Sequence, residues 1–191
     1  MDLAALAHPH SGVYGGQMPI ARFVTDSSLD FVARRLRFLG YDVAGFGSAR
    51  LEELFEAAAR DGRVLLTLSA RHPRRFGSVA VLRVPRGEPA IAVREVAARF
   101  EPADPPFSRC PECNSPLQIR HPIEARGEVP GRVLRSYTEF RYCPLEGKWY
   151  WNGTHVERIR RWLESALGRP LAAPGTARKP GEAGPGAAIE P

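Results

Sequence analysis

Three cysteines and one glutamate are spaced like the two halves of a metal site. Cys110 and Cys113 frame the segment CPEC, and Cys143 and Glu146 frame the segment CPLE at the same spacing. Such paired knuckles hold structural Zn²⁺ in a tetrahedral set of ligands. Zinc also accepts a carboxylate oxygen at about the distance of an imidazole nitrogen. We therefore interpret this region as a zinc-ribbon-like module with a Cys₃Glu ligand set.

Two other interpretations of this region stay open. His155 or His121 could complete the metal site in place of Glu146. Alternatively, the region binds no metal, and its cysteines are small apolar residues buried among aromatic side chains. These aromatic residues are Phe140, Trp149, Tyr150 and Trp151. Because three cysteines cannot pair evenly and two form C-x-x-C, the pattern favours a reducing compartment, and we predict a cytoplasmic protein.

A second group of residues that could do chemistry follows strand-like segments. Asp26 comes directly after IARFVT, and the loop SARHPRRFG after RVLLTL carries Arg71, Arg74 and Arg75. A carboxylate is a ligand for Mg²⁺ or Mn²⁺, whereas guanidinium groups repel a cation and bind phosphate. The loop therefore favours an anionic ligand at the site that Asp26 marks.

Alternating strands and helices are expected to position these groups. Periodicity predicts strands over 20–25, 42–46, 63–68 and 79–84, a first helix that includes residues 29–39, and further helices over 51–60 and 90–100. Ser27 with Asp30 is the expected N-cap of the first helix, and Gly40 its expected end. The alternation predicts an α/β fold with a mostly parallel sheet covered by helices, whose loops at the carboxyl ends of the strands build the site.

The rest of the chain divides by composition. Residues 1–17 show no periodicity and are predicted to be an unstructured leader, with Met18 as a possible true start. The α/β domain is expected over 18–104, and the ribbon module with a closing helix at 155–167 over 105–168. Residues 169–191 are rich in Pro, Gly and Ala and are predicted to be a disordered tail.

The overall charge favours a polyanionic partner. The 191 residues include 27 Lys+Arg against 21 Asp+Glu, a formal charge of +6, and nearly all the cations are arginine. A GC-rich genome, which encodes arginine by default, would give the same composition without any such partner. No run approaches the roughly 18 apolar residues that cross a membrane, and no small-molecule cofactor motif is apparent.

Several ordered segments resemble the Mut-seven C-terminal RNase domain family. The first is FVTDSSLDFVARRLRFLGYD (23–42), and the second is GRVLLT (62–67), which in the family continues into Thr-Arg-Asp. FSRCPECNSPL (107–117) and EFRYCPLEGKWYWNGTH (139–155) resemble the ribbon of that family. The resemblance implies a PIN-like three-layer domain followed by a zinc ribbon, in a group that cuts RNA with a divalent metal.

The resemblance also implies which residues would be catalytic. Asp26 matches the acid after the first strand, but the acid of the second helix falls on Leu51 and the Asp of Thr-Arg-Asp falls on Ser69. Glu52 and Glu53 are adjacent substitutes for the second acid. The expected catalytic residues are therefore Asp26 with Glu52 or Glu53 as the second acid, around Mg²⁺ or Mn²⁺, and two carboxylates are fewer than such a site needs.

Basic residues indicate an alternative function, which is RNA binding without cleavage. Arg34 and Arg37 share a face of the first helix and match basic positions of the family, and Arg71, Arg74 and Arg75 lie near the mouth of the site. We expect these five to bind RNA. Three hypotheses follow: a metal-dependent ribonuclease, a degenerate RNA-binding module, and a protein-interaction module whose partner the sequence does not name.

Overall fold

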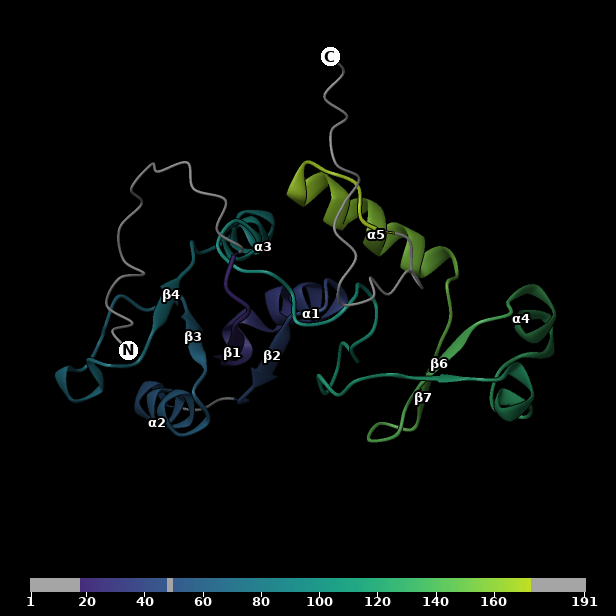
Figure 1. Cartoon of the computed structure of the whole chain (residues 1–191), viewed down its shortest axis with the longest axis horizontal. Coiled ribbons are helices and arrows are strands. Elements are labelled where there is room, and N and C mark those ends of the chain that lie inside the picture. Colours follow the sequence, from purple (N-terminus) through teal and green to yellow (C-terminus); the bar gives the residue numbers. More distant parts are fainter. Residues whose placement is uncertain (1–17, 48–49, 173–191) are drawn as a thin grey trace, which may run out of the picture.

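A computed structural model describes residues 18–47 and 50–172 of the chain (Figure 1). The predicted leader, 1–17, and most of the predicted tail, 173–191, lie outside the described residues. None of the helices in the described ranges combines the length and the apolar character that crossing a bilayer requires.

Four short parallel strands form the central sheet. They are β1 (Arg22–Thr25), β2 (Asp42–Gly45), β3 (Val64–Thr67) and β4 (Val81–Arg83). Their order is β2-β1-β3-β4, and all three pairings are parallel. The predicted α/β fold class with a mostly parallel sheet is therefore confirmed.

Helices cover both faces of this sheet. Phe23 packs with α1 (Asp30–Phe38) and α3 (Pro89–Ala97), whereas the next residue, Val24, packs with α2 (Leu51–Asp61) on the other face. Neighbouring strand residues point to opposite faces, so each strand contributes to two apolar clusters. The result is the expected three-layer arrangement, with α2 opposite α1 and α3 (Figure 1).

The start of the first helical segment differs from the prediction. Asp26, not Ser27, is the N-cap: its side chain accepts a hydrogen bond from the Ser28 amide at 2.8 Å and caps a short 3₁₀ turn, Ser27–Leu29, that precedes α1. Aspartate accepts this bond well because it is short and anionic. At the other end, Gly40 has a φ of 94°, and a Cβ there would lie 1.9 Å from the Asp104 carbonyl oxygen. Only glycine fits, which agrees with the expected helix end.

The ribbon is a small antiparallel sheet beside the main one. Its strands are β5 (Gln118–Arg120), β6 (Phe140–Cys143) and β7 (Lys148–Tyr150). A 3₁₀ turn, Pro122–Ala125, and a short helix, α4 (Gly131–Ser136), lie between β5 and β6, where the sequence carries little helical pattern. Phe140 is fully buried at the centre of this module, and Trp149 and Trp151 pack against its cluster. These aromatic residues therefore serve the ribbon's core.

The last helix, α5 (Thr154–Leu167), returns to the α/β part of the chain (Figure 1). Ile159 and Leu163 are buried in the same apolar cluster as the residues of α1 and α3, and Arg94 donates to the Ala166 carbonyl oxygen at 2.8 Å. The division at 104/105 stays a prediction. This packing runs across it, because α5 follows the ribbon in sequence but shares the core of the first part.

Candidate functional site

A cleft of about 360 Å³ opens at the carboxyl edge of the main sheet. The loops after β1, β3 and β4 and the start of α2 contribute its lining. Because parallel strands end at one edge, the side chains that follow them converge there. The residues that line it are Asp26, Ser28, Leu51, Thr67, Leu68, Ser69, Arg71 and Arg86.

The three positions that the family resemblance assigns to acids all line this cleft. They are Asp26, Leu51 and Ser69, and only Asp26 carries a carboxylate. That carboxylate is engaged locally, since its Oδ1 accepts hydrogen bonds from both the amide and the hydroxyl of Ser28. Of the described residues lining the cleft, Asp26 is thus the single acid, and it serves as a helix cap.

The two glutamates expected to substitute for the missing acid do not line the cleft. Glu53 turns back to the start of its own helix, where it accepts a hydrogen bond from the Arg50 amide at 3.0 Å. Glu52 forms an exposed ion pair with Arg75 at 2.9 Å. Acids are favoured in the first turn of a helix for this capping role. The structure therefore does not bring Glu52 and Glu53 together with Asp26 in the cleft.

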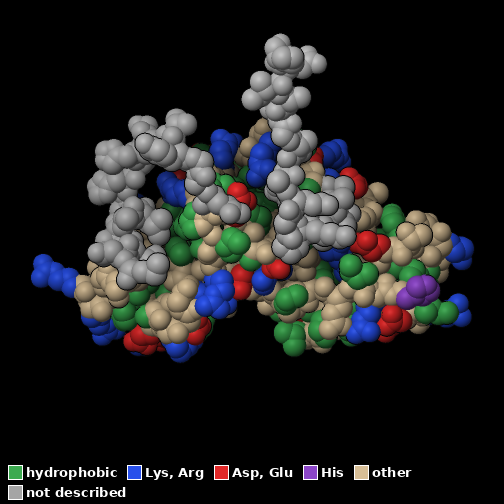
Figure 2. Space-filling view, viewed as in Figure 1, with side chains coloured by type: hydrophobic (Ala, Val, Ile, Leu, Met, Phe, Trp, Pro, Cys, Tyr) green, Lys and Arg blue, Asp and Glu red, His purple; other side chains and the backbone are tan. Residues whose placement is uncertain are grey.

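Arginines give the cleft its charge. Arg71, an expected RNA-binding residue, lines it together with Arg86, which the sequence reasoning missed. Arg86 follows β4, and β4 is the neighbour of β3 in the parallel sheet. The loops after these two strands therefore meet at one edge, and this topology could have indicated Arg86. Arg74 is exposed on the adjoining 3₁₀ turn, and Arg75 on the same turn is paired with Glu52. Across the face drawn in Figure 2, basic and acidic side chains are interspersed.

The first helix carries two arginines that were expected to bind RNA, and their surroundings differ. Arg34 is half-exposed and pairs with Asp30 at 3.0 Å and with Glu112 at 2.8 Å. Arg37 is 2% exposed, and it donates to the carbonyl oxygens of Val43, Pro111 and Glu112. Burial lowers the pKa of Arg37. Its guanidinium therefore joins the helix to the ribbon and offers no surface to RNA.

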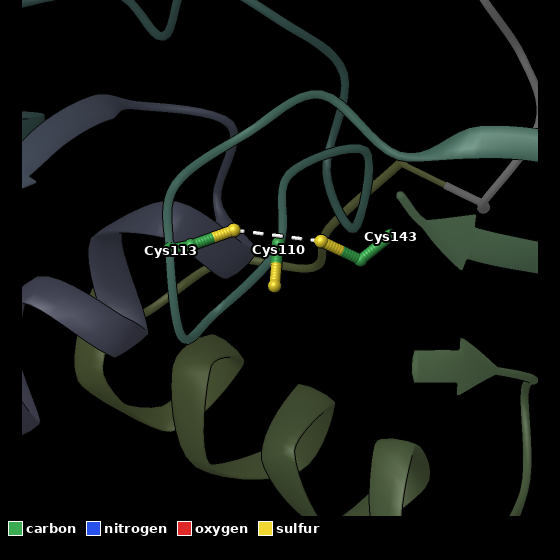
Figure 3. A group of neighbouring side chains, drawn as sticks. All are labelled: Cys110, Cys113 and Cys143. Carbon is green, nitrogen blue, oxygen red and sulfur yellow. Dashed lines mark hydrogen bonds between the residues drawn. The ribbon is translucent and has the colours of Figure 1, made fainter. Parts of the chain in front are cut away.

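The three cysteines lie together, as their spacing predicts (Figure 3). Their sulfur atoms are within 4.8 Å of one another, and Cys113 and Cys143 point toward each other with a sulfur–sulfur distance of 3.4 Å. Cys110 and Cys143 are fully buried, and all three are free thiols. Three thiolates at this separation could hold one metal ion.

The fourth predicted ligand is not part of this cluster. The Glu146 carboxylate lies 4.0 Å from the Lys148 ammonium group, while its backbone amide donates to Cys143 Sγ at 3.4 Å. His121 is also occupied elsewhere, since its Nδ1 accepts from the Ile123 amide, and His155 is exposed at the start of α5. The structure therefore groups the three cysteines without the Glu146 carboxylate or either histidine, and the identity of a fourth ligand stays a prediction.

Two hydroxyl groups border the three sulfur atoms. Ser115 Oγ is 3.1 Å from Cys113 Sγ and 3.2 Å from Cys143 Sγ, and the Tyr150 hydroxyl is 3.3 Å from Cys110 Sγ. Burial alone would raise the pKa of the Cys143 thiol, but hydrogen bonds from Ser115 and the Glu146 amide outweigh it and lower that pKa. The environment thus favours a thiolate at Cys143.

The first knuckle also covers the free edge of the main sheet. Asn114, with a φ of 69°, accepts from the Val43 amide at 3.0 Å and donates to Asp42 at 2.8 Å. Asp42 in turn pairs with Arg63 at 2.7 Å. Burial opposes ionisation of Asp42, but these hydrogen bonds outweigh it and lower its pKa. Since β2 is an edge strand, these contacts satisfy backbone groups that would otherwise be open.

A three-layer domain with a parallel sheet, joined to a ribbon with a three-cysteine cluster, is the class of protein that this fold and site define. The family model described as the Mut7-C RNAse domain matches residues 21–163. This chain belongs to that family, as the resemblance predicted. Searches of curated proteins and of solved structures returned no match. Membership indicates a ribonuclease-like function and a role that involves RNA.

Proposed function

We propose that the protein binds RNA in the cleft at the carboxyl edge of the sheet, and that it does so without a catalytic metal. The observation that carries this proposal is the exchange of charge in the cleft. Of the positions that the family resemblance assigns to acids, Leu51 and Ser69 line the cleft without a carboxylate, while Arg71 and Arg86 line it with guanidinium groups.

A divalent cation and a phosphate group need different side chains, and those of the cleft suit phosphate. Mg²⁺ and Mn²⁺ need several oxygen ligands, and Asp26 alone, already capping a helix turn, supplies too few. Arginine matches a phosphate group through paired N–H donors. No carboxylate of the described residues lies within ion-pair distance of Arg71 or Arg86, in contrast to Arg75 with Glu52. Within the part of the chain that the structure describes, both guanidinium groups are therefore available to neutralise an RNA backbone.

The first prediction concerns salt-dependent binding. A single-stranded RNA oligomer, measured by fluorescence anisotropy in EDTA, should bind with an affinity that falls as salt rises, by about 0.7 log units per log unit of salt for each neutralised phosphate. The double variant Arg71→Ala/Arg86→Ala should lower the affinity roughly 20-fold at 0.1 M salt, because it removes two such contacts. Binding that does not respond to salt would contradict the proposal.

A matched control uses two arginines at the opposite edge of the sheet. Arg60 and Arg99 lie at the ends of α2 and α3, and each is exposed and paired with a neighbouring acid. The variant Arg60→Ala/Arg99→Ala removes the same net charge but should leave RNA affinity within about threefold of wild type. An equal loss in both double variants would mean that net charge, not the cleft, attracts the RNA.

The metal-dependent ribonuclease remains the second candidate, because Asp26 lines the cleft in a family of RNase domains. Its test is incubation of the same RNA with Mg²⁺ or Mn²⁺, using Asp26→Asn as the control. Under our proposal the RNA stays intact and Asp26→Asn binds it at least as tightly, since a negative charge has been removed. Cleavage that vanishes in Asp26→Asn would establish the second candidate instead.

We also propose that the three-cysteine cluster binds a structural Zn²⁺ ion. Its sulfur atoms lie close enough to share one ion, and hydroxyl groups of Ser115 and Tyr150 border the cluster. When bound, zinc would tie together the two knuckles of the ribbon, and it would have no part in a reaction. The ligand set is then Cys110, Cys113 and Cys143, without Glu146.

The second prediction is a metal content of about one zinc per chain by elemental analysis of the purified protein. Cys143→Ser should reduce it to a small fraction, because two thiolates bind zinc far more weakly than three. Glu146→Gln should retain the wild-type content, since the Glu146 carboxylate lies toward Lys148 rather than the sulfurs. Loss of zinc in Glu146→Gln would contradict this ligand set and support the Cys₃Glu site that the sequence predicted.

A further inference from the structure

A second hollow, of about 190 Å³, adjoins the cleft. Ser28 and Leu68 line both cavities, so the two lie side by side at the carboxyl edge of the sheet. The chemistry of the second hollow is different, because apolar side chains dominate its lining. Besides the two shared residues, its lining consists of Leu29, Phe31, Val32, Pro85, Gly87, Glu88 and Pro89.

Phe31 is the aromatic side chain of this hollow, and it is 46% exposed. The guanidinium carbon of Arg35 lies 4.2 Å from the centre of its ring, and Trp162 meets it edge to face at 5.6 Å. These two neighbours fix the orientation of the ring while leaving much of it open to solvent. An exposed, oriented aromatic ring is a surface on which a planar group can stack.

We infer that this hollow holds an unpaired nucleobase of the RNA whose phosphate lies against Arg71 and Arg86, an inference that rests on the proposed function. Arg86 stands between Pro85 and Gly87, two residues of the hollow, so a nucleotide bound to Arg86 has its base at the entrance. Glu88 repels a second phosphate but accepts hydrogen bonds from base amino groups.

This assignment narrows the class of RNA. A base can stack on Phe31 only when it has left its own helix, so the site selects single-stranded segments, loops or ends over continuous duplex. Stacking of this kind tolerates any base, because every base has a planar face. The cleft then binds the phosphate of a nucleotide, and the hollow binds its base.

The test compares two probes: a single-stranded RNA oligomer and an abasic ribose-phosphate oligomer of the same length. Phe31→Ala and Phe31→Leu should weaken binding of the base-containing RNA roughly 5- to 150-fold, and should leave binding of the abasic oligomer unchanged. Phe31→Leu keeps apolar bulk and so guards against a folding defect in Phe31→Ala. Phe31→Trp should restore the affinity, because it restores an aromatic plane.

Ile20 provides the matched control, since it is 64% exposed and precedes β1 at the opposite edge of the sheet. Ile20→Ala should bind both probes like wild type. If the Phe31 variants bind the base-containing RNA normally while Arg71→Ala/Arg86→Ala binds it weakly, the base site is overturned and the proposed function stands. If wild type binds neither probe, the proposed function fails and the base site fails with it.

Discussion

Arg37→Met is expected to lower the free energy of unfolding by about 3–5 kcal/mol, the largest loss of stability that we predict for a single substitution. Arg37 donates to three carbonyl oxygens, two of which belong to the CPEC knuckle. Methionine keeps much of the side-chain length but leaves these acceptors, two of them buried, without this donor, at about 1–3 kcal/mol for each buried one. Urea denaturation followed by tryptophan fluorescence measures the change.

Arg34→Met is the control for that measurement. Arg34 lies one turn before Arg37 on the same helix, but its ion pairs with Asp30 and Glu112 are half-exposed. Such pairs contribute about 0–1 kcal/mol, so this variant should remain close to wild type. Similar losses in the two variants would mean that the number of hydrogen bonds formed by Arg37 does not reflect its contribution to stability.

Arg37 also shows where prediction from the sequence ends. Its spacing from Arg34 correctly indicated a shared helix face. Periodicity predicted every strand of the main sheet, and the helices that cover it, with bounds within a few residues of those observed. What buries Arg37 is the backbone at Pro111 and Glu112, far away in sequence. A local pattern contains no information on such a contact. The predicted RNA-binding surface therefore included a residue that the tertiary fold removes from solvent.

The candidate site, too, could be predicted from the sequence only in part. The parallel topology follows from the alternation of strands and helices, and it correctly implied that the loops after β1 and β3 meet. The cysteine cluster follows from its spacing. The position of Glu146 does not, because a carboxylate on a turn can face the sulfurs or the solvent, and the turn that directs its amide to Cys143 directs its side chain to Lys148. Such orientations depend on rotamers that the sequence leaves open.

The charge of the cleft can be reversed by substitution, and this gives the second large effect. Leu51→Asp/Ser69→Asp places carboxylates at two positions that line the cleft with Asp26. We expect this variant to bind Mn²⁺ saturably in calorimetry, whereas wild type shows no such binding, because three acids supply the oxygen ligands that one cannot. Its RNA affinity in EDTA should fall roughly 20-fold at 0.1 M salt, since two added negative charges offset Arg71 and Arg86.

Leu51→Asn/Ser69→Asn separates charge from shape in this experiment, because asparagine has nearly the size of aspartate and no net charge. It should bind no Mn²⁺ and should keep most of the RNA affinity. Leu51 begins α2, where aspartate is favoured by the helix dipole, so the acidic variant is expected to fold despite the loss of a half-buried leucine. Saturable Mn²⁺ binding by wild type with equal affinity would show that Asp26 recruits a metal without these partners, and the cleft would then be a metal site rather than a phosphate site.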